Sequence, residues 1–344
     1  TTGGILNMFL DPIFIFGLCG MPALGVKGAA IATVIGQIAA GITAIIMNKK
    51  VKAIIISSVA LVSALGIATG VFFGMFPMKP DVKIMSADRR IKNNDTLLVA
   101  SYNTASPWGS FIEGTYTTRR AHLFAQQINY YMPDVLGVQE LNSIWQGKME
   151  ELLPQYAYYG VKRGGDAKEE TSEMSGIFYL KDKFELVDSG TFWISNTPEK
   201  ESKYENAACH RICSFVVLKN KSTGKMLAHL NTHLDHVSTE AQDLGGKLIA
   251  EKTEEIKAKY GEITTVITGD FNQYPDGLAI KTLKDKGFVN AYDVSENGKM
   301  TSTYHGWGKI LEDKPIDFIF TSSDVTVKDY AVQDEKWDNS YVSD

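Results

Sequence analysis

Three apolar stretches occupy the first 76 residues of the chain. Ile5–Gly20 carries Asp11 as its only charge, and neither Gly28–Asn48 nor Ala53–Phe76 carries any. A run of about 20 apolar residues crosses a bilayer as a helix, and Ala53–Phe76 has 24 uncharged residues. A buried helix of a soluble domain is the alternative, but one of this length without a polar face is unusual. The pattern therefore predicts transmembrane helices at the start of the chain.

After residue 94 the pattern becomes that of an α/β domain, residues 95–344. Short apolar or β-branched runs predict strands over Thr96–Asn103, Val135–Gln139, Ser175–Leu180, Thr191–Ile194, Ile212–Leu218, Met226–Asn231, Ile263–Thr268 and Ile316–Phe320. Amphipathic spacing predicts helices over Arg119–Tyr131, Ser143–Leu153 and Ala241–Lys259. The turn-like Asn220-Lys-Ser-Thr-Gly224 between two runs predicts an antiparallel hairpin. Residues 77–94, which are polar, are expected to tether this domain to the membrane segment.

The segment over residues 47–76 resembles a signal anchor. The basic Met47-Asn-Lys-Lys-Val-Lys52 precedes the apolar core, as in a secretory signal. That core is longer than in most cleaved signals, so an uncleaved anchor is expected. Lysines before the core stay cytoplasmic, which places the α/β domain outside the cell. The basic residues on the other flank, Lys79, Lys83, Arg89 and Arg90, oppose this orientation.

The most informative short stretch is Thr268-Gly-Asp-Phe-Asn-Gln-Tyr-Pro275, which follows an apolar strand. Gly269 allows a turn, and Asp270 and Asn272 are two residues apart, a spacing that puts both side chains on one side of an extended chain. A carboxylate can take a proton from water, and an amide can hold a phosphoryl oxygen. An ordinary Asx turn is the alternative for these residues alone.

Asn103 and Glu140 end two of the other predicted strands. Oxygen donors of this kind suit Mg²⁺ or Mn²⁺, which prefer carboxylate and amide ligands and retain several waters. Glu140 alone is also explained as a carboxylate at a helix N-terminus.

His233, in His229-Leu-Asn-Thr-His-Leu-Asp-His236, ends an apolar strand and is a candidate general acid or phosphate ligand. His229 is expected to be a buried core residue, and Glu173 is a candidate carboxylate to orient His233. Zinc is not indicated, because no cysteine or HExxH spacing accompanies His233 and His236.

Asp317 is a charge flanked by apolar residues in a predicted strand, so it should pair with a histidine or a metal-bound water. The net charge is −5 and the pI is near 5.8, which gives no overall basic field for nucleic acid. The three cysteines form no disulfide framework, and Cys209 and Cys213 either pair or stay reduced.

These motifs, in this order, resemble the endonuclease/exonuclease/phosphatase superfamily of DNase I-like, metal-dependent phosphoesterases. The resemblance implies a two-sheet α/β sandwich, here preceded by transmembrane helices. It also implies metal ligation by Asn103, Glu140 and Asp344. The catalytic residues that it implies are His233, supported by Glu173, and Asp270, Asn272 and Asp317.

One feature departs from the family pattern. The terminal Ser-Asp-His motif ends here at Asp344, and no histidine follows it. The chain is therefore expected to be a C-terminally truncated fragment, and loss of an acid–base histidine typically costs on the order of 10²–10⁴-fold in rate.

Substrate contacts are expected from Arg211, His305 and Trp307. Arg211 suits a bidentate phosphate clamp, with a surface salt bridge as the alternative. His305 and Trp307 suit stacking on a base or sugar, although Trp307 equally suits covering the core.

The predicted function is Mg²⁺- or Mn²⁺-dependent hydrolysis of phosphodiesters, as a nuclease or phosphodiesterase, by a monomer that acts on a phosphate ester, nucleotide or nucleic acid. The alternatives are a phosphomonoesterase, a phospholipid headgroup hydrolase, and an inert binding module.

Residues 1–46 contain Leu6-Asn-Met-Phe-Leu-Asp-Pro-Ile-Phe-Ile-Phe-Gly17 and Gly25-Val-Lys-Gly-Ala-Ala-Ile-Ala-Thr33. They resemble a piece of a multidrug and toxic compound extrusion transporter. Such carriers need about a dozen helices around a pathway, so this segment is expected to be a fused fragment that does not transport.

Overall fold

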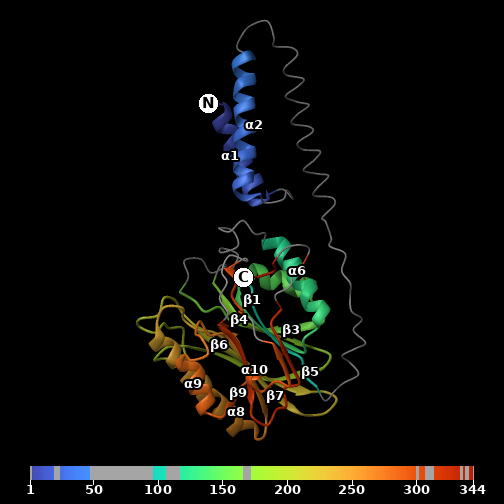
Figure 1. Ribbon diagram of the computed structural model, residues 1–344, viewed down its shortest axis with the longest axis vertical. Coiled ribbons are helices and arrows are strands. Elements are labelled where there is room, and N and C mark those ends of the chain that lie inside the picture. Colours follow the sequence, from blue (N-terminus) through green and yellow to red (C-terminus); the bar gives the residue numbers. More distant parts are fainter. Residues whose placement is uncertain are drawn as a thin grey trace. The chain divides into compact units, whose positions relative to one another are not determined.

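The computed structural model describes residues 2–18, 24–46, 96–105, 117–165, 172–299, 302–306, 314–333, 336–337 and 341–343 (Figure 1). The predicted anchor and tether, Trp307 and Asp344 lie outside these residues. The chain divides into two compact units. One contains the N-terminal helices and the other contains the sheets.

The N-terminal unit contains a pair of apolar helices, α1 (Thr2–Phe16) and α2 (Gly25–Ile46). Glycines bring them together, because a Cβ at Gly36 would lie 2.1 Å from Asn7 Oδ1 and one at Gly28 would lie 2.2 Å from the Phe14 carbonyl oxygen. Among the described helices, α2 alone has the length and hydropathy to cross a membrane. A single such helix near an N-terminus is a weak candidate for a span, since a signal sequence has the same features.

The larger unit is built on two mixed sheets. One has the strand order β1-β2-β4-β3 and contains Val99–Asn103, Val135–Leu141, Met174–Leu180 and Tyr156–Tyr159. The other has the order β5-β6-β7-β8-β11-β9 and contains Phe184–Trp193, Ile212–Asn220, Met226–His233, Thr264–Asp270, Asp317–Ser322 and Phe288–Asn290. The short strands β10 (Asn297–Lys299) and β12 (Asp329–Ala331) form a separate pair.

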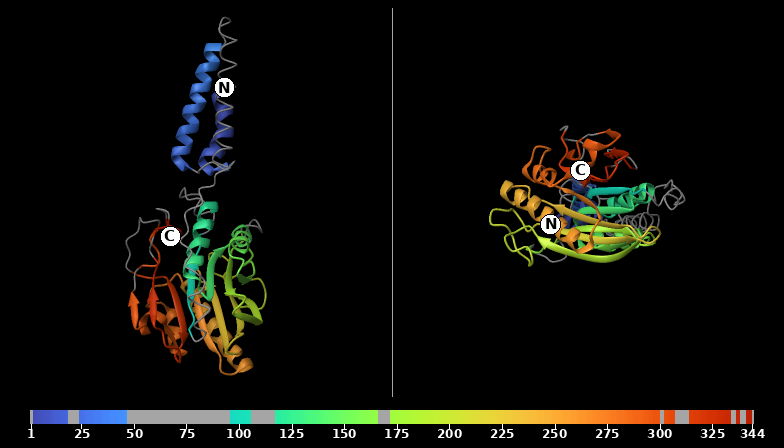
Figure 2. Two further views of the ribbon diagram at one scale, coloured as in Figure 1. Left: turned by 90° about the vertical axis from the view of Figure 1, so that its right-hand side faces the viewer. Right: turned by 90° about the horizontal axis from the view of Figure 1, so that it is seen from below.

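Helices cover the outer face of each sheet. Core residues of α6 (Thr117–Tyr131) and α7 (Ser143–Leu152) cluster with those of β2, while residues of α8 (Thr239–Tyr260) and α9 (Leu278–Asp285) cluster with those of β7 and β8. A third cluster, which includes Val135, Ile177, Val216 and Val266, fills the space between the sheets. Helix α10 (Ala291–Val294) is one turn long. The predicted two-sheet α/β sandwich is confirmed (Figures 1 and 2).

All eight predicted strands and all three predicted helices of this unit are present. The predicted hairpin at Asn220–Gly224 joins β6 to β7, which pair antiparallel. Each sheet contains one parallel pair of strands, and these pairs position the polar side chains of the site described below. β1 runs parallel to β2, and β7 runs parallel to β8, so the carboxyl ends of each pair lie together.

Candidate active site

Strand β8 ends in an Asx turn that presents Asp270. Asp270 Oδ1 accepts a hydrogen bond from Asn272 N at 2.8 Å, and Asn272 has a φ of +47°. Gly269 does not make this turn, contrary to the sequence prediction. It stays in the strand, where a Cβ would lie 2.5 Å from the Thr232 carbonyl oxygen of β7. The Asx turn weighed in the sequence analysis is therefore present, and it fixes the carboxylate in place.

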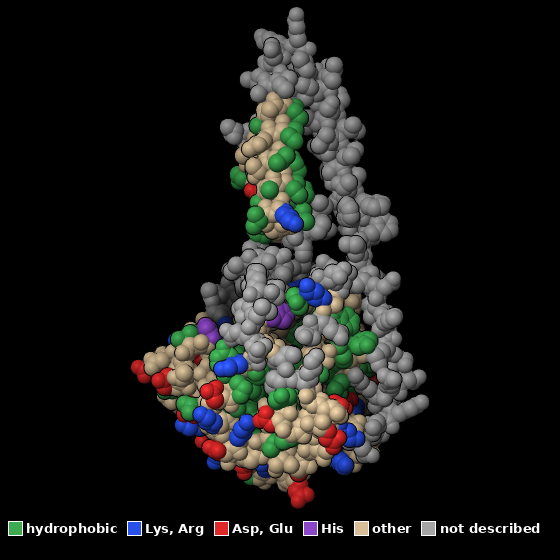
Figure 3. All heavy atoms as spheres, viewed as in Figure 1, with side chains coloured by type: hydrophobic (Ala, Val, Ile, Leu, Met, Phe, Trp, Pro, Cys, Tyr) green, Lys and Arg blue, Asp and Glu red, His purple; other side chains and the backbone are tan. Residues whose placement is uncertain are grey.

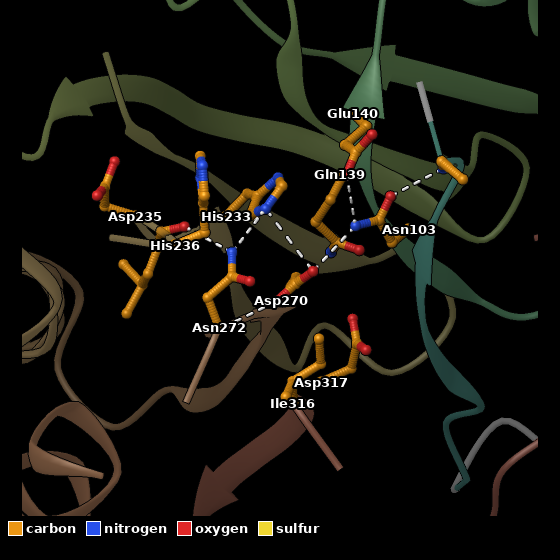
Figure 4. Close-up of polar contacts among 12 residues, drawn as sticks. Asn103, Gln139, Glu140, His233, Asp235, His236, Asp270, Asn272, Ile316 and Asp317 are labelled. Atoms are coloured by element: carbon orange, nitrogen blue, oxygen red, sulfur yellow. Dashed lines mark hydrogen bonds and ion pairs between the residues drawn. The ribbon is translucent and has the colours of Figure 1, made fainter. Parts of the chain in front are cut away.

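Asn103 joins the ends of β1, β2 and β8 (Figure 4). Its Nδ2 donates to Glu140 Oε1 at 3.1 Å and to Asp270 Oδ2 at 3.0 Å. Its Oδ1 accepts from Ala105 N at 2.9 Å. The amide nitrogen therefore faces the two carboxylates, and ligation of a cation by the Asn103 oxygen requires the amide to rotate.

Glu140 is presented by a β-bulge. The β2–β4 register pairs Val138 with Gly176 and Leu141 with Met174, so Gln139 and Glu140 together oppose one residue of β4. Glu140 has a φ of +56°, in the left-handed region that glycine favours. A bulge of this kind bends the strand and re-aims a side chain.

The carboxylates fit a hard divalent cation. Glu140 and Asp270 are bonded to one amide nitrogen, so two negative groups share a small space, and Glu140 acts to raise the pKa of Asp270 by repulsion. Oxygen donors of this type are those that Mg²⁺ and Mn²⁺ prefer. Glu140 and a rotated Asn103 would hold the cation beside Asp270, while the contribution expected of Asp344 concerns a residue outside the described part.

Burial is the main influence on Asp270, and it raises the pKa of this carboxyl to about 6. Hydrogen bonds from Asn272 and Asn103 act in the opposite direction. A carboxylate with a pKa in this range is suited to accept a proton near neutral pH.

His233 ends β7 and is buried, with 7% of its surface exposed. Its Nε2 lies 3.0 Å from Asn272 Nδ2 and 3.7 Å from Asp270 Oδ2. Burial, followed by the charges of Arg211 and Arg163, holds the pKa of His233 well below its ordinary value. The ring is therefore neutral, and Nε2 accepts from Asn272 while Nδ1 carries the proton.

The side chain of Asn272, which was expected to hold a phosphoryl oxygen, contacts His233 in the structure. Its amide nitrogen is shared between His233 Nε2 and the Leu234 carbonyl oxygen, each at 3.0 Å. The side chain therefore positions the histidine, and its predicted contact with phosphoryl oxygens stays a prediction.

The expected bond between Glu173 and His233 is not formed. Glu173 Oε2 pairs with Arg163 Nη1 at 2.6 Å, and His233 Nδ1 has no hydrogen-bond partner within the described part of the chain. Sequence reasoning missed Arg163, which precedes two glycines and belongs to no predicted element. Its backbone pairing with Glu173, through Arg163 N and the Glu173 carbonyl at 2.9 Å, brings it to the site.

Arg211 is buried, with 5% exposure, so the alternative of a surface salt bridge is wrong. Its Nη2 lies 3.0 Å from His236 Nδ1, and its Nε lies 3.8 Å from Asp235 Oδ2. Nε has no hydrogen-bond partner among the described residues. Asp235, which sequence reasoning did not select, accepts backbone hydrogen bonds from Ala208 and from three further residues, Cys209, Val237 and Ser238.

Cys209, Asp235 and His236 place their ligand atoms within 4.8 Å of one another. Both carboxylate oxygens of Asp235 already accept backbone hydrogen bonds, and Arg211 occupies His236 Nδ1. These contacts and the nearby positive charge disfavour a metal at this cluster. Cys209 and Cys213 are free thiols.

A small hollow lies among these groups. Its lining combines one proposed cation ligand, two arginines and the buried histidine, and comprises Glu140, Arg163, Glu173, Met174, Ser175, Arg211, Ile212 and His233. It therefore brings together five of the selected or newly found polar residues.

The remaining predicted residues lie along the β11 side and the C-terminal segment. Asp317 starts β11 opposite Asp270 and is half-buried. The ring of His305 lies tilted against that of Tyr341, with 4.2 Å between the ring centroids and 43° between the ring planes. Ser343 donates from Oγ to the Asn103 carbonyl oxygen at 2.5 Å, which brings the residue before Asp344 to the site.

The solved structures most similar in the comparison come from Bacteroides. A mannosyl-6-phosphatase of Bacteroides thetaiotaomicron is 32% identical, with a TM-score of 0.66 over 70% of this chain and 91% of that one. An endonuclease/exonuclease/phosphatase of Bacteroides vulgatus is 30% identical, with a TM-score of 0.64 over 72% of this chain and 95% of that one. No curated protein matched, and nothing supports the transporter resemblance of residues 1–46.

The model of the endonuclease/exonuclease/phosphatase family matches residues 100–344, which include every polar group of the site described above. The neighbours and the family together indicate a phosphoesterase. The chain belongs to the endonuclease/exonuclease/phosphatase family.

Proposed function

We propose that the chain is a phosphatase that hydrolyses phosphate monoesters with the help of Mg²⁺ or Mn²⁺. This differs from the phosphodiesters favoured in the sequence analysis. The observation that carries the proposal is the hollow beside His233, which Arg163 and Arg211 line together with Glu140 and Glu173.

A terminal phosphate suits this hollow better than a diester does. A monoester phosphate presents three non-bridging oxygens and up to two negative charges, whereas a diester presents two oxygens and one charge. Arginine binds such oxygens through several N–H donors. Arg211 Nε and His233 Nδ1 are buried donors that have no hydrogen-bond partner among the described residues.

The contacts of the site residues support a separate catalytic role for each of them. Asp270 accepts the proton of the attacking water, which its raised pKa favours. His233, held by Asn272, donates from Nδ1 to a phosphoryl oxygen. Arg211 and Arg163 neutralise charge on the phosphate. A cation on Glu140 and its neighbours, when bound, stabilises the developing charge on the phosphoryl group.

Charge on the surface favours a small substrate over a nucleic acid. The net charge is −5, and on the face in Figure 3 the basic and acidic side chains of the larger unit are intermixed. A nucleic-acid groove usually carries a continuous basic stripe. The similarity to a mannosyl-6-phosphatase supports a sugar phosphate as the first natural substrate to test.

We further propose, as in the sequence analysis, that the chain is a membrane-anchored monomer with its catalytic unit outside the cell. The apolar α2 and the basic segment that begins at Met47 support this arrangement.

The test is phosphate release from mannose 6-phosphate and p-nitrophenyl phosphate by the full chain in detergent, with Mg²⁺, Mn²⁺ or EDTA. The proposal expects metal-dependent release that falls in Asp270→Ala and persists in Lys247→Ala. Lys247 is a suitable control because its exposed ion pair with Asp243 lies on α8. Release that is equal in EDTA, or unchanged in Asp270→Ala, would contradict the proposal.

A further inference from the structure

A buried polar cluster links the two sheets directly beneath the site. Asn231 of β7 is fully buried, and its Oδ1 accepts from Gln139 Nε2 at 2.6 Å and from Thr268 Oγ1 at 3.0 Å. Thr268 Oγ1 in turn lies 2.8 Å from His229 Nε2. A buried polar group is costly when it is left unbonded. Both ends of the Asn231 amide are bonded, whereas Gln139 Oε1 and His229 Nδ1 have no partner among the described residues.

The other end of the Asn231 amide contacts the bulge of β2. Its Nδ2 donates to the Val138 carbonyl oxygen at 3.0 Å and to the Gly176 carbonyl oxygen at 2.8 Å. Val138 and Gly176 are the last regular pair of β2 and β4 before the register shift. One side chain from the opposite sheet therefore bonds both strands where the bulge begins.

The same amide also holds the first residue of the bulge. Gln139, whose side chain donates to Asn231, immediately precedes Glu140. The left-handed φ of Glu140 is a strained conformation for a residue other than glycine, and it persists only where surrounding contacts impose it. The Asn231 hydrogen bonds are contacts of that kind.

We propose that Asn231 is a positioning residue that holds the β2 bulge and thereby aims Glu140 at the cation. This inference rests on the proposed function, in which Glu140 is a cation ligand. His229 serves a different purpose, because its hydrogen bond goes to Thr268 and reaches neither carbonyl at the bulge.

The experiment is a titration of the substrate-free full chain with Mn²⁺, in which electron paramagnetic resonance measures the free ion. Asn231→Ala removes all of these hydrogen bonds, and Asn231→Ser is the milder form if the first variant folds poorly. His229→Gln is the matched control, since His229 lies two residues earlier in β7 and is also fully buried. Circular dichroism and thermal unfolding are measured for every variant.

The inference expects Mn²⁺ to bind about 10- to 100-fold more weakly to folded Asn231→Ala, while His229→Gln keeps the wild-type affinity. In a double-mutant cycle, Asn231→Ala should add little to the loss already caused by Glu140→Gln. Wild-type affinity in the Asn231 variants, equal weakening in the control, or additive losses would each overturn the inference. If the wild-type chain itself binds no Mn²⁺, the proposed metal site fails, which is a separate result.

Discussion

Three non-glycine residues with positive φ lie at the ends of site strands. They are Ala105, Glu140 and Asn272, and Met132 is the fourth such residue in the described part of the chain. Each follows or ends β1, β2 or β8, beside the carboxylates or His233. Strained backbone is found where surrounding structure imposes it, commonly at functional sites. The strained backbone at these residues therefore makes the folded protein less stable than the packing around the site alone would make it.

Asp270→Asn should separate stability from activity. Its folded-state pKa of about 6 lies above the ordinary value of 3.8, so the ionised form is disfavoured by folding. Replacing the carboxylate by an amide should raise Tm in EDTA above pH 6 by at least about 2 °C. The gain should shrink as pH falls from 6 through 4 and vanish at about pH 3, where Asp270 is protonated in both states. Activity should fall on the order of 10²–10⁴-fold.

Calorimetry across pH and phosphate-release assays measure these two effects. A lower Tm for Asp270→Asn at pH 8, or a gain that grows on acidification, would contradict the assignment of a costly buried charge.

The pH dependence of kcat/KM follows from the same group. Asp270 must be ionised to accept a proton, so activity should rise with pH through an acid limb at about pH 6 or below, because a bound cation lowers the pKa further. Steady-state rates from pH 4.5 to 8 would check this. His233 should add no inflection to the pH profile of kcat/KM near pH 6.5, since its pKa is held well below that value.

Residues that end strongly apolar strands were predictable from sequence. Asp270 and His233 follow long β-branched or apolar runs, and both lie in the site. Arg163 was not predictable, because its position depends on backbone pairing with a segment ten residues away. The partner of Glu173 was predicted wrongly for a related reason: a nearby arginine competes for the carboxylate. The spacing of residues along the sequence does not show which of two possible partners a carboxylate will bind.

At the level of elements, Gly137 of β2 is a point of close contact between the two sheets. A Cβ there would lie 2.1 Å from Thr268 Oγ1 and 2.5 Å from Asn231 Oδ1. Both atoms belong to buried, hydrogen-bonded side chains, so neither moves away freely. Gly137→Ala should therefore lower the free energy of unfolding by about 1–3 kcal/mol.

The control for this substitution is Gly147→Ala. Gly147 is inside α7, and a Cβ there meets nothing within 4 Å. Alanine should stabilise this exposed helical position by up to about 1 kcal/mol. Urea unfolding of both variants tests the argument, which is contradicted if Gly137→Ala is as stable as the wild type.

Long elements with clear periodicity were predictable, and short ones were not. Helix α8 was predicted over Ala241–Lys259 and spans Thr239–Tyr260, with Ser238 as its N-cap. Strand β3 was missed because Tyr156–Tyr159 shows no alternation, and β9 has only three residues. Such short strands form because a neighbouring strand offers hydrogen bonds, which is a tertiary effect.

At the scale of the whole catalytic unit, one edge of the sandwich gathers residues distant in sequence. Asn103 and Asp270 are 167 residues apart and share a hydrogen bond. The resemblance to the family implied that these residues meet in one site. The residue patterns alone predicted only that each of them ends a strand. The stacking of the sheets and the bulge at Glu140 depend on Asn231 and Gly137, whose roles appear only when both sheets are in place.

We expect the hollow lined by Arg163 and Arg211 to select a terminal phosphate over a diester. The most direct measurement is kcat/KM for p-nitrophenyl phosphate and for methyl p-nitrophenyl phosphate, which share a leaving group, in the wild type and Arg211→Gln. The wild type should have the higher kcat/KM on the monoester. Arg211→Gln should lower kcat/KM about 10- to 100-fold on the monoester and by a smaller factor on the diester. A wild type that prefers the diester, or equal losses on both substrates, would contradict this expectation.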